Sequence, residues 1–128
     1  MNVLLDTHTL LWAALAPHFL SSKASRIIND EANTVFVSAA SAWEIATKVR
    51  IGKLPGAEKF EREFLERVEL AGYTLLPIDA ATALRAGRFT GDHRDPFDRM
   101  IAAQAIAADI PVLSKDPKLD IFGIRRIW

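Results

Sequence analysis

Short apolar segments alternate with helix-like segments along the whole of this 128-residue chain. The apolar segments are continuous rather than interrupted at every second position, which is typical of strands covered on both faces. Strands are expected at residues 3–5, 34–37, 73–78, 111–113 and 124–127. Regular alternation of strands with helices predicts an α/β/α sandwich with a mostly parallel sheet of about five strands.

The segments between the expected strands carry helix signals. Residues 57–71 place Phe60, Phe64 and Val68 on one stripe, which predicts a single amphipathic helix. Asp95 followed by Pro96 is a strong helix start, because aspartate caps the first turn and proline fits its first position. The helix that begins at Asp95 is expected to reach residue 108. Four other helices are expected: residues 8–15; residue 22 to residue 29 or 31; residue 38 or 41 to residue 51; and residues 79–86.

Length and composition narrow the class of protein. The 128 residues suffice for one core, so residues 1–128 are expected to form a single domain. The chain has 16 Lys and Arg residues together and 16 Asp and Glu residues together, so its charges balance. A polyanion could therefore bind only at a local basic patch. The chain has no cysteine, which excludes thiolate metal sites and cysteine nucleophiles. It shows no signal peptide and no apolar run of membrane-spanning length, so we expect a soluble, cytoplasmic protein without a membrane partner.

Four acidic residues lie where expected strands end or helices begin. Asp6 directly follows the first strand, and Asp116 follows the fourth after two residues. Glu44 and Asp98 belong to helices that begin at the same edge of a parallel sheet, which is the edge where ligands bind. At about 5 Å and an effective dielectric of about 20, each carboxylate pair costs roughly 3 kcal/mol. A converging set therefore either takes up protons or holds a cation.

Each of these acids alone also has an ordinary structural interpretation. Asp6 could cap a helix, and Glu44 could form an exposed ion pair with Lys48 four residues later. Asp98 could complement a helix dipole, and Asp116 could be a turn residue. Together, however, they predict an all-oxygen site for Mg²⁺ or Mn²⁺. Such a site suits displacement at a phosphodiester.

Longer motifs surround the four acids. They are Leu-Leu-Asp6-Thr-His-Thr, Ser-Ala-Trp-Glu44-Ile-Ala, His93-Arg-Asp95-Pro-Phe-Asp98-Arg and Leu-Ser-Lys-Asp116. In combination they resemble the PIN-domain family and, more narrowly, the VapC-type toxins of bacterial toxin–antitoxin pairs. The resemblance extends over essentially the whole chain.

This resemblance implies a flavodoxin-like parallel sheet and a Mg²⁺-dependent endoribonuclease whose metal ligands match Asp6, Glu44, Asp98 and Asp116. It also implies a homodimer, and an antitoxin protein that inserts a segment near the active site. Residues 57–71 are the expected antitoxin contact. Which RNA would be cut, and whether one or two ions bind, stay open.

Substrate contacts are expected from residues close to the acids in sequence, because RNA needs cationic and hydrogen-bonding partners. The candidates are Arg94, Arg99, Ser114 and Lys115. Several aromatic residues could stack on bases, but their helical spacing favours the core or a protein interface. These residues are Trp12, Trp43, Phe60, Phe64 and Phe97.

Rival interpretations of the same fold class remain. A receiver-type signalling module could use Asp79 as phosphate acceptor, but Asp6 lacks the adjacent second acid that receivers usually carry. A haloacid-dehalogenase-type phosphatase needs Asp-x-Asp, whereas this chain has Asp6-Thr7-His8. A noncatalytic partner-binding PIN-like protein would use the acids only as caps. Metal-dependent RNA cleavage separates the nuclease from the last of these.

Overall fold

The computed structural model describes every residue from Met1 to Trp128. Its strands form one sheet in which every neighbouring pair is parallel. They are β1 (Asn2–Leu5), β2 (Thr34–Ser38), β3 (Thr74–Leu76), β4 (Val112–Leu113) and β5 (Arg126–Ile127). The order across the sheet is β3-β2-β1-β4-β5. The predicted parallel α/β architecture is confirmed.

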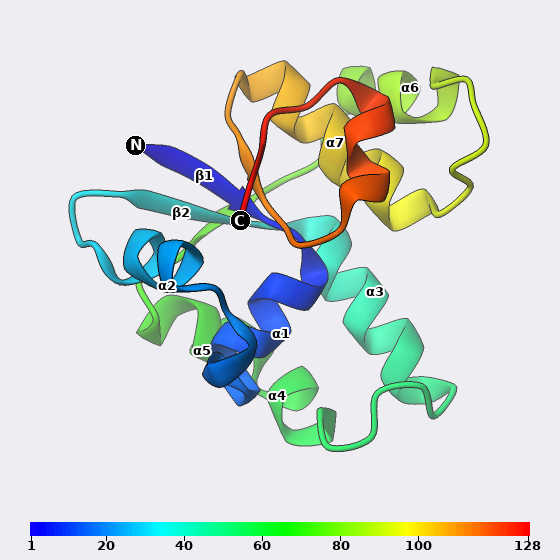
Figure 1. Cartoon of the computed structure of the whole chain (residues 1–128). Coiled ribbons are helices and arrows are strands. Elements are labelled where there is room, and N and C mark those ends of the chain that lie inside the picture. The colour runs from blue at the N-terminus through cyan, green and yellow to red at the C-terminus, as the bar shows by residue number, and fades with distance from the viewer.

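Helices cover both faces of this sheet (Figure 1). On one side lie α6 (Ala80–Arg88), α7 (Pro96–Ala108) and the 3₁₀ helix η2 (Pro117–Phe122). On the other lie α1 (Thr7–Leu15), the short η1 (Pro17–Phe19), α2 (Ser22–Asn29), α4 (Glu58–Arg62) and α5 (Phe64–Leu70). The remaining helix, α3 (Ala39–Arg50), packs against both α1 and α7. No helix is both long and apolar enough to cross a lipid bilayer.

Alternate residues of the central strand feed two separate cores. Val3 and Leu5 of β1 belong to a cluster built with α1, α2, α3, α4 and α5, whereas Leu4 belongs to a second cluster built with α7 and η2. All three side chains are fully buried. Burying such a side chain contributes roughly 1.5–3 kcal/mol, so both helical layers are held to the same strand. This explains why the strand residues are apolar without alternation.

The single helix predicted over residues 57–71 is wrong. The chain bends at Glu63, so α4 and α5 are two short helices. Phe60, Phe64 and Val68 nevertheless all enter the same core, where the two phenyl rings meet edge to face. The hydrophobic stripe reports which side of a helix is buried but not the direction in which the helix runs.

A buried glutamine fixes the two helices that carry Glu44 and Asp98. Gln104 of α7 receives a hydrogen bond from the Ser38 hydroxyl, which also caps α3. The Gln104 side-chain amide donates to the carbonyls of Leu76 and Pro77 at the end of β3, both at 3.2 Å. The carboxyl ends of β2 and β3 and the middle of α7 are therefore joined by one buried polar group.

Candidate active site

The strand order creates a crevice between β1 and β4. These strands are neighbours, yet the chain leaves β1 toward β2 and β3 on one side before it crosses to β4 and β5 on the other. Ligands of open parallel sheets bind at such a reversal, beyond the carboxyl ends of the strands. A pocket of about 240 Å³ lies there, lined by Asp6, His8, Trp12, Lys115 and Asp116.

Asp6 and Asp116 are joined through one hydroxyl group. Asp6 caps α1, because its Oδ1 accepts the Thr9 amide hydrogen at 2.8 Å. Its Oδ2 accepts a hydrogen bond from the Ser114 hydroxyl. The Ser114 oxygen in turn accepts the Asp116 amide hydrogen at 3.0 Å. The capping interpretation of Asp6 is thus correct, but each carboxylate oxygen keeps a second lone pair for another ligand.

Glu44 is buried rather than displayed on a surface helix. Only 4% of the residue is exposed. Its Oε2 is paired with the Lys48 ammonium group, and its Oε1 is buried with no hydrogen-bond partner. An unsatisfied buried polar atom costs about 1–3 kcal/mol, and more when it is charged. The expected ion pair with Lys48 exists, but it faces the interior.

Asp98 lies in the first turn of α7, where Asp95 performs the capping. Asp95 Oδ1 accepts the amide hydrogens of Phe97 and Asp98 at 2.9 and 3.1 Å. The Asp98 side chain is therefore available for another contact, and its Oδ2 lies 2.8 Å from His93 Nε2. Burial raises the pKa of Asp98 to about 6; the His93 hydrogen bond opposes this rise, and the negative charges of Asp95 and Glu44 add to it.

The four acids form two pairs at one edge of the sheet. Asp6 and Asp116 share Ser114, and Glu44 lies near enough to Asp98 to shift its pKa. The two pairs are connected, because the hydroxyls of Thr7 on α1 and Ser41 on α3 are hydrogen-bonded at 2.9 Å. Within the second pair, Trp43 of α3 packs edge-on against Phe97 of α7. No three carboxylate or imidazole groups are close enough together to form a ready coordination sphere.

The chemistry of these groups fits a divalent cation. Glu44 presents a buried oxygen without a donor. Ionisation of Asp98 is disfavoured first by burial and then by the charges of Asp95 and Glu44, so the pKa of Asp98 is raised. Both features are what a buried anionic site shows before a cation offsets its charge. All candidate ligands are oxygens, which suits Mg²⁺ or Mn²⁺.

The predicted substrate contacts have different surroundings. Lys115 lines the pocket and Arg94 is exposed beside His93. Ser114 is fully buried and holds Asp6. Arg99 donates to the backbone carbonyls of Ala86, Phe89 and His93, so its guanidinium fastens the loop before α7.

The aromatic residues also divide. Phe60, Phe64 and Phe97 are buried, as expected of core residues. Trp43 is 59% exposed, which excludes core packing for it and leaves a protein interface or base stacking. Half-buried Trp12 contacts Trp128 and lines the acidic pocket.

His8 and Lys48 were not predicted from the sequence to belong to the site. His8 is two residues after Asp6 in the first turn of α1, and that spacing is the signal that could have brought it to the pocket.

Comparison with known protein families identifies the family of this chain. The model for the PIN domain matches residues 3–124. The chain belongs to the PIN domain family. Ribonuclease VapC22 of Mycobacterium tuberculosis is 35% identical to this PIN domain over 122 residues, which are 92% of the chain and 89% of that protein. Ribonuclease VapC16 of the same organism is 42% identical over 55 residues, which are 43% of the chain and 39% of that protein.

Solved structures share the fold of this PIN domain. VapBC2 from Rickettsia felis, bound to a DNA fragment from its promoter, superimposes with a TM-score of 0.71, at 19% identity and with 99% and 98% of the two chains covered. VapBC-1 from nontypeable Haemophilus influenzae gives a TM-score of 0.66, at 16% identity and with 99% and 97% covered. The chain is thus a VapC-type PIN domain in both sequence and fold.

The raised pKa of Asp98 predicts a pH dependence of stability in the metal-free protein. An aspartate pKa raised from about 3.9 to about 6 on folding gives stability that is present below pH 4 and lost as the pH rises through 6. The loss amounts to at most about 3 kcal/mol. In Asp98→Asn this component is absent. Urea unfolding in chelator from pH 4 to 7 should show wild type losing stability relative to the variant; parallel curves would contradict this assignment.

Proposed function

We propose that this PIN domain is a Mg²⁺-dependent endoribonuclease, with Mn²⁺ able to replace Mg²⁺, that acts on RNA in the cytoplasm. The observation that carries the proposal is Glu44, a buried carboxylate with one oxygen unpartnered, beside Asp98 at the edge of the sheet. A protein that used its acids only as caps would have no reason to bury such a group. The VapC-type relatives, which are ribonucleases by name, support RNA as the substrate.

Each acid has a role in this proposal. Asp6, Glu44 and Asp98 would hold one cation, directly or through water, and Asp116 would hold a second ion or position the attacking water. A bound divalent cation supplies activation of water and stabilisation of the charge that develops at the phosphodiester. Ser114 orients Asp6 through its hydroxyl hydrogen bond.

RNA would reach the site across its exposed rim. Lys115 lines the acidic pocket and supplies a cation for phosphate. Arg94 is exposed on the loop before α7. Trp43 is held edge-on by Phe97 and exposes the rest of its indole, which suits stacking on a base next to the scissile bond.

The sheet order argues against the receiver-type alternative. β3 lies at the edge of the sheet, and β2 separates it from β1. Strands are about 4.8 Å apart, so the residues that follow β1 and β3 are about 10 Å apart. Asp79 is exposed and accepts the Thr82 amide hydrogen as the cap of α6. It is therefore a poor partner for a cation held by Asp6.

Replacement of Asp6 or Asp98 by Asn should abolish metal-dependent RNA cleavage, with a loss of at least about 100-fold. The amide keeps the size of the side chain and, at Asp6, the cap of α1, because Asn and Asp are equivalent N-caps. Ser114→Ala should lower cleavage by about 10- to 100-fold, as is usual for a group that orients a metal ligand. Cleavage of a labelled RNA with and without Mg²⁺, together with circular dichroism, measures both.

Asp79→Asn is the matched control for these variants. Asp79 also caps a helix after a parallel strand, but at the edge of the sheet. Its replacement should leave cleavage unchanged. Full activity of a folded Asp6→Asn protein, or inactivity of Asp79→Asn, would refute the proposed site.

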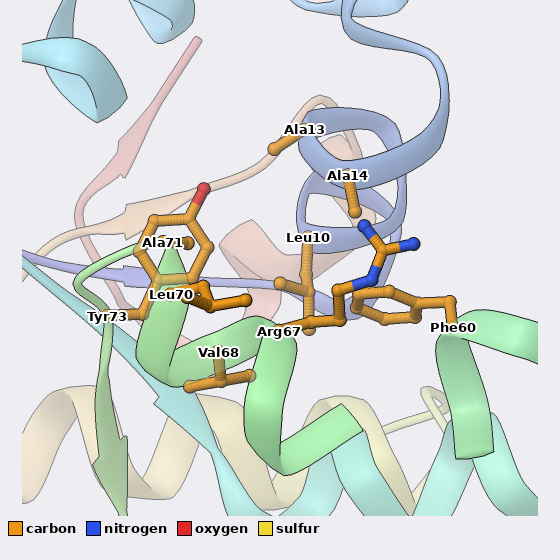
Figure 2. Close-up of a pocket in the computed structure, with 9 residues that line it drawn as sticks. All are labelled: Leu10, Ala13, Ala14, Phe60, Arg67, Val68, Leu70, Ala71 and Tyr73. Carbon is orange, nitrogen blue, oxygen red and sulfur yellow. The ribbon is translucent and has the colours of Figure 1, made fainter. Parts of the chain in front are cut away.

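A protein partner also belongs to the proposal. A groove of about 240 Å³ lies between α1 and α5, and eight of its nine lining residues are hydrophobic (Figure 2). Leu70 borders it and is 84% exposed. Within the expected contact at residues 57–71, Phe60 and Phe64 are core residues, so Leu70 offers the exposed apolar surface beside the groove. We propose that an antitoxin segment packs against Leu70 and the exposed side of α1. The structural neighbours VapBC2 and VapBC-1 are toxin–antitoxin complexes and support such a partner. The protein itself is proposed to form a homodimer.

Leu70→Asp should weaken binding of the proposed cognate antitoxin by more than about 1 kcal/mol, which is the loss expected at an interface hot spot. RNA cleavage by the variant alone should be unchanged. Leu84→Asp is the control, because Leu84 is 55% exposed on α6, which lies on the other side of the sheet. Affinity is measured by titration calorimetry with the purified partner. Equal binding by both variants would refute the groove as the contact.

A further inference from the structure

Lys48 holds a special position among the basic residues. Of all lysines and arginines, only Lys48 forms an ion pair with one of the four candidate ligands. It lies one turn after Glu44 on α3, and its ammonium group contacts Glu44 Oε2. The other oxygen of the same carboxylate is the unpartnered one. A cation is therefore already in contact with the most buried part of the acidic cluster.

The burial of this pair differs from that of an ordinary helical ion pair. Glu63 and Arg67 have the same spacing, but their side chains are 36% and 39% exposed. In the Lys48 pair the glutamate side chain is 5% exposed and the lysine side chain 28%. A buried carboxylate needs a counter-ion, since loss of its partner leaves an uncompensated charge. The lysine keeps partial access to solvent and has a flexible stem, so its ammonium group is able to leave.

We propose that Lys48 is a built-in counter-ion that neutralises Glu44 in the metal-free protein and is displaced when a divalent cation binds. The proposal rests on the proposed metal site and adds a determinant of its affinity. Lys48 and the cation compete for the same carboxylate, so each weakens the other by the same factor. The lysine therefore allows Glu44 to stay buried in the metal-free protein. It also sets the cation concentration at which the site fills.

If Lys48 competes with the metal ion, its removal should raise the affinity for metal. If Lys48 instead supports the site, its removal should lower that affinity. Lys48→Met removes the competing charge but keeps an apolar stem of similar length. Mn²⁺ and Mg²⁺ should then bind at least about fivefold more tightly, which is the lower end of ordinary coupling between two binding events. The metal-free variant should also melt at a lower temperature than wild type, and the rise in melting temperature on addition of Mn²⁺ should be larger. Lys48→Arg keeps the charge and should bind metal no more tightly than wild type.

The experiment is titration calorimetry with MnCl₂ and with MgCl₂ at pH 8 on the full chain, combined with thermal melts with and without Mn²⁺. Lys53→Met is the control, since Lys53 is an exposed lysine just beyond the end of α3 and forms no ion pair. It should behave as wild type. Glu44→Gln reports on the metal site itself and should lose most of the binding.

The outcomes separate the two proposals. If Glu44→Gln loses the metal while Lys48→Met binds it with unchanged or lower affinity, the metal site stands and the role of Lys48 is overturned. If Glu44→Gln binds metal as wild type does, or if neither wild type nor Lys48→Met binds metal, both proposals fail. Tighter binding by Lys48→Met alone, with Lys53→Met unchanged, supports the counter-ion role.

Discussion

The repulsion among carboxylates at the buried edge of a parallel sheet is the constraint around which this protein is built. Four acidic side chains lie at one edge of the sheet, and each has a specific hydrogen-bond or ion-pair partner. These partners are the Ser114 hydroxyl at Asp6, the Lys48 ammonium group at Glu44, the His93 ring at Asp98 and the Lys118 amide at Asp116. These donors reduce the repulsion only in part. Glu44 keeps an unpartnered oxygen, and Asp98 keeps a raised pKa. The remaining imbalance is what a divalent cation would remove.

The scaffold keeps this arrangement in place through contacts far from the crevice. β1 is apolar on both faces and joins two cores, so the position of Asp6 at its end is fixed from above and below. Gln104 ties α7 to the cap of α3 and to the end of β3. Arg99 fastens the loop that carries His93. Polar groups outside the crevice therefore hold the helices that carry Glu44 and Asp98.

Local signals allowed much of this to be predicted from the sequence. The cap formed by Asp95 and Pro96, the acid after β1 and the parallel sheet each follow from the residues themselves or from the alternation of elements. The bend at Glu63, the exposure of Trp43 and the burial of the Lys48 ion pair do not. These three depend on the direction in which one helix crosses another, which periodicity does not encode. The division of the acids into two pairs likewise depends on side-chain conformations that the sequence leaves open.

The four acids, in the function proposed for this protein, form one cation site at the reversal between β1 and β4. Anomalous diffraction from crystals of the protein soaked in Mn²⁺ tests it most directly. We expect an anomalous peak bounded by the carboxylates of Asp6, Glu44 and Asp98, and loss of that peak in Glu44→Gln. A peak elsewhere on the molecule, or no peak in crystals saturated with Mn²⁺, would contradict it.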